Sequence, residues 1–128
     1  MPGYGAFPWQ GLAARVGCKF HTLDRGNWFT LNRVESWGVY YARDAGSVGY
    51  VRPLVFDRAW ALLASGGEVT LPVLGAIIAD VNRDASETDQ SCVAALVASA
   101  GGIRYLTGPI RLRLRGEGVG RTFRPECP

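Results

Sequence analysis

The strongest constraint on the fold is a change in hydrophobic period at Pro53. Before this residue, short runs of aromatic and β-branched residues alternate with turns built from Gly, Asp, Asn and Ser, a pattern typical of β-strands. From residue 54 onward, apolar residues recur every three or four positions, which is the period of an amphipathic helix. A run of strands followed by a run of helices predicts an α+β fold.

We expect a single compact domain of 128 residues with three parts. Residues 1–53 form an N-terminal antiparallel β-meander, in which the first sixteen residues are an irregular arm rich in proline and aromatic side chains. Residues 54–115 form a three-helix unit closed by a C-terminal β-hairpin. Residues 116–128, which begin with a glycine-rich stretch, form a flexible basic tail. The four predicted strands of the meander are residues 18–22, 28–34, 39–42 and 48–52.

Three apolar faces with helical spacing predict the three helices. Gly66 and Gly67 end the first helix, and Thr70 is the predicted N-cap of the second. The third helix spans residues 86–100 and ends at two further glycines. The apolar residues that define these faces are Phe56, Ala59, Trp60 and Leu63; Leu74, Ile77, Ile78 and Val81; and Val93, Leu96, Val97 and Ala100.

The last predicted strand carries an arginine at every second position, in the sequence Ile110-Arg111-Leu112-Arg113-Leu114-Arg115. Strand geometry places the aliphatic residues on one face and the three guanidinium groups on the other. Residues 101–128 contain six Arg and two Glu, whereas residues 1–100 contain eight basic and nine acidic residues. The excess positive charge is therefore confined to the end of the chain, where it indicates either a surface for a polyanion or a solvated face.

The order of a helix, a short extended link at residues 68–70, two further helices and a hairpin resembles the winged helix-turn-helix superfamily over residues 54–115. The resemblance implies that residues 103–115 are the wing and that residues 86–100 are the recognition helix. It implies nucleic-acid binding, with DNA favoured over RNA, through phosphate contacts and limited base readout. The residues that it implies as nucleic-acid contacts are Arg104, Arg111, Arg113, Arg115, Arg121, Arg124, Gln90 and Ser91.

The predicted recognition helix departs from this pattern because its outward face carries no Arg or Lys. Three acidic residues near its start, Asp84, Glu87 and Asp89, would repel phosphates. The alternative is a protein–protein adaptor or assembly subunit, or a homodimer, in which small side chains let another backbone approach closely. The residues of this alternative interface are Ala94, Ala95 and Ala98.

The aromatic residues of the meander raise a further hypothesis, that flat rings next to arginines stack on nucleic-acid bases or line a small-ligand pocket. Trp37 and Tyr41 are the candidates for base stacking. Trp37 is the stronger one because it lies in a predicted turn, where packing explains a tryptophan less readily. The alternative is that these aromatic residues cover the core of a small sheet.

Cysteine and histidine content argues against a metal site and against catalysis. Cys18, Cys92 and Cys127 are odd in number and widely spaced, so we expect reduced thiols and a Cys92 that packs in the core. Cys18 and His21 have the spacing of a zinc-ligand pair, but a second short-spaced pair is lacking. With one histidine and no nucleophile motif, we predict no enzyme activity and no cofactor. Without a signal peptide or a long apolar run, we expect a cytoplasmic protein with no membrane partner.

Overall fold

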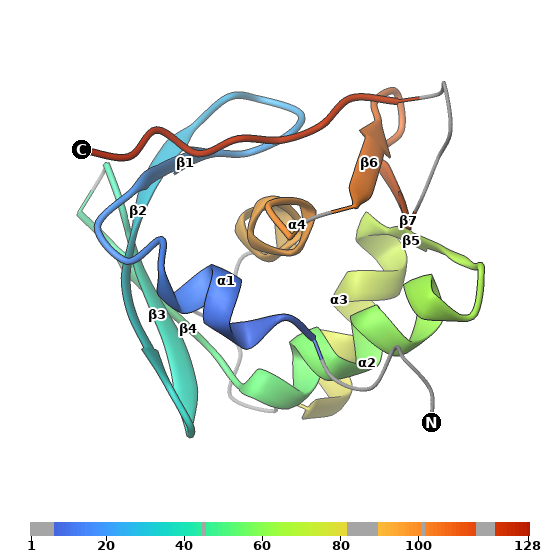
Figure 1. Cartoon of the computed structure of the whole chain (residues 1–128), viewed down its shortest axis with the longest axis horizontal. Helices are drawn as coiled ribbons and strands as arrows, with labels where there is room; N and C mark the ends of the chain where they lie inside the picture. Colours follow the sequence, from blue (N-terminus) through green and yellow to red (C-terminus); the bar gives the residue numbers. More distant parts are fainter. Residues whose placement is uncertain (1–6, 45, 82–89, 101, 115–119) are drawn as a thin grey trace.

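The structure is a computed structural model that describes residues 7–44, 46–81, 90–100, 102–114 and 120–128. It is a mixed α+β fold in which two antiparallel sheets lie on opposite sides of a central helix, α4 (Gln90–Ala98) (Figure 1). Sheet A holds the N-terminal strands and sheet B holds the hairpin near the C-terminus. None of the helices in the described ranges has both the length and the apolar character needed to cross a membrane.

Sheet A is the four-stranded antiparallel meander expected from the alternating pattern, with strand order β1-β2-β3-β4. Phe29 and Leu31 alternate with more exposed neighbours along β2, as the period of two predicts. The β2–β3 register shifts between Leu31 and Arg33, which marks a bulge. The strands are β1 (Lys19–His21), β2 (Trp28–Glu35), β3 (Gly38–Arg43) and β4 (Val48–Val51).

The predicted helices are present, with α2 (Pro53–Ala64) and α3 (Leu71–Val81) preceding α4. Pro53 occupies the first turn of α2, where its missing N–H removes no helical hydrogen bond. The predicted start of the third helix at residues 86–89 lies outside the described residues. Part of the N-terminal arm is a short helix, α1 (Trp9–Ala13), rather than irregular chain, and it packs near α2.

Sheet B joins the link strand to the hairpin, so that the strand order is β5-β7-β6. Val69, Leu112 and Tyr105 are cross-strand partners in one row and are buried. The alternation along β7 therefore points Leu112 into the core, as the sequence predicts. The strands are β5 (Glu68–Thr70), β6 (Ile103–Leu106) and β7 (Arg111–Leu114).

Helix α4 is enclosed by the rest of the fold. Every residue from Cys92 to Ala98 is buried, and α4 contacts β1 on one side and β6, α2 and α3 on the others. The prediction that Ala94, Ala95 and Ala98 form an outward face is therefore wrong. The physical reason is that their small side chains let two sheets and two helices pack closely around one helix.

Residues 120–128, the C-terminal strap, are held in place rather than flexible as the sequence predicts. The strap pairs with β6 at Arg121 and with β1 at Glu126, and it runs across the molecule between them (Figure 1). Phe123 is buried and stacks on Phe20. Cys127 forms a disulfide with Cys18, so the expectation of reduced thiols is wrong for this pair. Cys92 keeps its thiol and is buried in the core, as predicted.

Candidate nucleic-acid interface

Strand pairing in sheet B brings three predicted contact residues onto one side of the sheet. Arg104 on β6 lies directly opposite Arg113 on β7, and cross-strand partners share a face. Arg111 is two residues before Arg113 and therefore also points to this side. Together, Arg104, Arg111 and Arg113 form a surface that we name the arginine face. Their three guanidinium groups lie on the opposite side of the sheet from the buried row that contains Leu112.

Glu68 provides a carboxylate within the arginine face. Glu68 is on β5 and is the cross-strand partner of Arg113 on β7. Its Oε2 lies 3.1 Å from Nε of Arg113 and 3.8 Å from Nη1 of Arg111. The side chains of Arg111 and Arg113 remain 43% and 49% exposed despite these contacts. One carboxylate thus contacts two of the three guanidinium groups, and the positive charge of this surface is only partly neutralised.

Two groups on the arginine face lack partners within the described part of the chain. Nε of Arg111 is buried and has no hydrogen-bond partner among those residues. Arg104 forms no salt bridge with any of them. An uncompensated cation such as Arg104 is stabilised by an incoming anion, because the anion supplies both an acceptor and a counter-charge. The buried Nε of Arg111 is out of reach of such an anion in this structure.

The C-terminal strap adds further positive charge beside sheet B. Arg121 and Arg124 are exposed, and the backbone of Arg121 is hydrogen-bonded to that of Tyr105 on β6. Neither arginine is in a salt bridge with another residue that the structure describes. Arg115, the remaining predicted contact of the wing, lies outside the described residues. The strap thus places Arg121 at the edge strand that also carries Arg104.

The start of α4 is its one accessible part within the described residues. Gln90 is exposed, and its side-chain oxygen lies close to Gly75 on α3. Ser91 is half-buried. Gln90 and Ser91 are thus placed at a helix end, while the rest of α4 is enclosed and presents no face to a groove of DNA.

The two predicted stacking residues have opposite environments. Tyr41 is fully buried and packs edge-on against Phe29, so its prediction as a stacking platform is wrong; the sheet needs this ring to fill its core. Trp37 is 57% exposed in the β2–β3 turn, where its carbonyl accepts a hydrogen bond from the hydroxyl of Tyr50. Trp37 and Tyr50 line a surface cavity of about 620 Å³, together with Arg52, Arg58 and Asp80, and Asp80 forms a salt bridge with Arg58.

Sequence reasoning overlooked Glu68 because nothing local to β5 identifies its neighbour. Its partner Arg113 lies far along the chain, and the pairing depends on the link strand joining the hairpin. The one signal in the sequence was a carboxylate in the extended link at residues 68–70, close to the end of α2. A β5–β7 pairing hypothesis would have placed that carboxylate beside an arginine.

No group of three or more His, Cys, Asp and Glu side chains is placed to hold a metal ion in the ranges that the structure describes. His21, the single histidine, packs against the rings of Trp28 and Phe123. Comparisons of this chain with protein-family models, with curated proteins and with solved structures found no match.

Proposed function

We propose that this protein binds nucleic acid, with duplex DNA preferred over RNA, and that the arginine face contacts the phosphates. The observation that carries this proposal is the register of sheet B, which gathers Arg104, Arg111 and Arg113 on one side, with Glu68 as the carboxylate partner of Arg111 and Arg113. Guanidinium groups bind phosphate oxygens through paired N–H donors. The phosphate backbone of a nucleic acid is a polyanion that such a row of arginines can bind.

The element order supports a winged-helix interpretation of residues 54–115. Helix α2, strand β5, helices α3 and α4, and the β6–β7 hairpin follow one another as the resemblance requires. In this interpretation the hairpin is the wing, and the wing carries the arginine face. The preference for DNA follows from this resemblance.

Base readout is limited in the proposed mode of binding. Because α4 is enclosed from Cys92 to Ala98, contact with base edges is restricted to Gln90 and Ser91 at its start. Arg121 and Arg124 on the C-terminal strap extend the phosphate contacts beyond the wing. Binding should therefore depend strongly on salt and weakly on sequence.

Fluorescence anisotropy with duplex DNA and duplex RNA across a series of salt concentrations tests the proposal. In the double variant R104A/R113A, we expect the slope of log affinity against log salt to fall in magnitude by about 0.9 for each phosphate that the variant no longer neutralises. Fold and stability should change little because both side chains are solvent-accessible. The matched control is R33A, which removes an arginine from sheet A on the far side of the molecule.

A solvated arginine face predicts a different result. In that case the double variant and R33A bind with the same salt slope as the parent protein, and the proposal is wrong. Equal affinities for RNA and DNA would agree with the proposed phosphate contacts but would contradict the preference for DNA. A homodimer belongs to the same proposal, and sedimentation of the purified chain tests it. A cytoplasmic location stays a separate prediction, which fractionation of cells tests; the Cys18–Cys127 disulfide favours an oxidising compartment instead.

The cavity beside Trp37 favours a second contact, in which a base stacks on the exposed indole. An exposed ring of this kind stabilises an unpaired base by about 1–3 kcal/mol. W37A should therefore weaken binding to single-stranded DNA more than binding to duplex DNA. W28A, which removes a more buried tryptophan from the same sheet, is the control, and an equal weakening on both substrates in W37A would contradict this role.

A further inference from the structure

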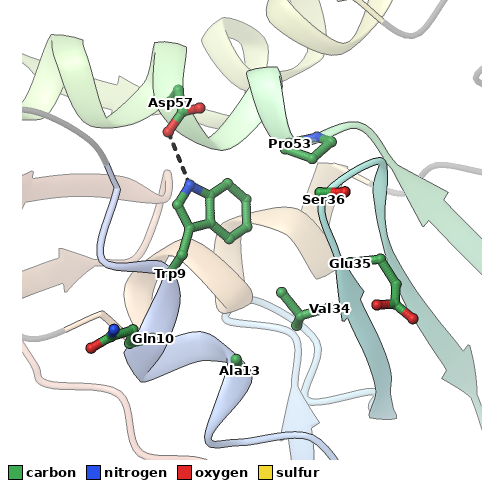
Figure 2. A pocket seen from close by; sticks show the side chains of 8 residues that line it. All are labelled: Trp9, Gln10, Ala13, Val34, Glu35, Ser36, Pro53 and Asp57. Atoms are coloured by element: carbon green, nitrogen blue, oxygen red, sulfur yellow. Dashed lines mark hydrogen bonds between the residues drawn. The ribbon is translucent and has the colours of Figure 1, made fainter.

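A second cavity, of about 430 Å³, lies between α1, the end of β2 and the start of α2 (Figure 2). Its apolar walls are Trp9, Ala13, Val34 and Pro53, and Glu35 and Asp57 also line it. This volume is in the range of small-molecule sites. The cavity is separate from the arginine face, and the proposed function does not use it.

The carboxylate of Asp57 has no cationic partner among the described residues. Its Oδ1 accepts hydrogen bonds from the indole Nε1 of Trp9 at 3.2 Å and from the backbone N–H of Phe7 at 3.4 Å, and both donors are neutral (Figure 2). Its Oδ2 accepts no hydrogen bond within the described ranges, although Asp57 is half-buried. A carboxylate that has been stripped of part of its hydration is stabilised by a cation that takes the open oxygen.

The other carboxylate of the cavity is already paired. Glu35 Oε2 accepts hydrogen bonds from Arg33, at 2.9 Å from its Nη2 and 3.3 Å from its Nε. In Figure 2 the Glu35 carboxylate points away from Asp57. The charge that remains for a ligand therefore belongs to Asp57.

The wall beside Asp57 suits a cation that also carries apolar surface. The indole ring of Trp9 is held by edge-on contacts with Phe7 and Phe56, with ring centroids 4.9 and 5.2 Å away. Tryptophan is the aromatic side chain that attracts organic cations most strongly, because of the negative charge on its ring face. The aliphatic surface of Val34 and Pro53 would contact alkyl groups.

We propose that this cavity binds a small organic cation of the alkylammonium class, with Asp57 as its counter-charge and Trp9 as its aromatic wall. Charge complementarity selects a cation, and the apolar walls select an alkylated one over a hydrated metal ion or a bare ammonium. The site does not depend on nucleic acid, and binding at it is measured without nucleic acid present.

Nuclear magnetic resonance titration of the full chain with choline tests the proposal. The probe signal is the indole N–H of Trp9, assigned by its disappearance in W9F. We expect choline to shift this signal saturably, and the neutral carbon isostere of choline, in which a tert-butyl group replaces the trimethylammonium group, to bind at least about tenfold more weakly. Titration with sodium chloride at the same ionic strength gives the control for salt.

Two variants separate the charge from the shape of the site. In D57N, which keeps an acceptor for the Trp9 N–H, choline and its isostere should bind with similar affinity. In A13L, a larger side chain enters the cavity from α1 and both ligands should bind more weakly. D24N, a charge change at an exposed turn residue, should behave like the parent protein.

Three results would overturn the proposal. The first is the absence of a saturable shift with choline in the parent protein. The second is equal affinity for choline and its neutral isostere, which would make the cavity a purely apolar site. The third is a D57N variant that still prefers choline, which would show that Asp57 is not the counter-charge.

Discussion

Glu68 is the residue that sets the charge of the arginine face. Its carboxylate lies within reach of both Arg111 and Arg113, which would otherwise repel each other and Arg104 across the sheet. Such an exposed ion pair contributes little to stability, on the order of 1 kcal/mol or less. In the proposed function, however, the same carboxylate competes with phosphate for the two guanidinium groups.

We therefore predict that E68Q binds duplex DNA more tightly than the parent protein, by about threefold to tenfold at moderate salt. The slope of log affinity against log salt should become steeper because more arginine charge is free to neutralise phosphates. Anisotropy titrations measure both quantities. E35Q makes the same charge change beside Arg33 on sheet A, and a gain in affinity as large as that of E68Q would assign the effect to net charge alone.

At the scale of elements, α4 is the centre of the fold and not a surface helix. A helix that is apolar all round is buried, and residues 92–98 contain no charged side chain to mark a solvent face. The small side chains of Ala94 and Ala95 fit where β1, α2, α3 and β6 converge. Substitutions on this helix therefore report on stability rather than on association.

We predict that A95E lowers the free energy of unfolding by about 3 kcal/mol or more, because it places a larger and charged group in a filled core. Chemical denaturation followed by circular dichroism measures this change. A61E, at an exposed position on α2, is the matched control and should stay within about 0.5 kcal/mol of the parent. A stable A95E protein with altered sedimentation would instead restore an interface role for this helix.

At the scale of the whole molecule, the C-terminal strap connects the two sheets. It pairs with β6 of sheet B at one end and with β1 of sheet A near the other, and the Cys18–Cys127 disulfide closes a loop with a sequence separation of 109 residues. Closing so long a loop lowers the conformational entropy of the unfolded chain, which stabilises the folded state relative to it. The strap also buries Phe123 against Phe20.

We predict that the double variant C18S/C127S is less stable than the oxidised parent protein by about 2–5 kcal/mol. Thermal unfolding with and without a thiol reductant measures the difference. The reductant should lower the Tm of the parent protein toward that of the variant and leave the variant unchanged, since its one remaining cysteine, Cys92, is in no disulfide. Equal Tm values for the variant and the oxidised parent would show that the bond does not stabilise the fold.

The hydrophobic period determined much of the secondary structure from sequence alone. The spacing of apolar residues along a segment decides which of its side chains face the core, and the spacing differs between strands and helices. The meander, the helices and the inward direction of Leu112 were therefore predictable. The arginine alternation along β7 was visible for the same reason.

The tertiary structure decided which distant segments meet. Ala95 is buried because β1, α2, α3 and β6 pack around α4. Glu68 lies beside Arg113 because β5 pairs with β7. The Cys18–Cys127 bond and the Trp9–Asp57 cavity likewise join residues far apart in the chain. No local period encodes such pairings, because they arise when the chain as a whole finds the packing that buries its apolar surface.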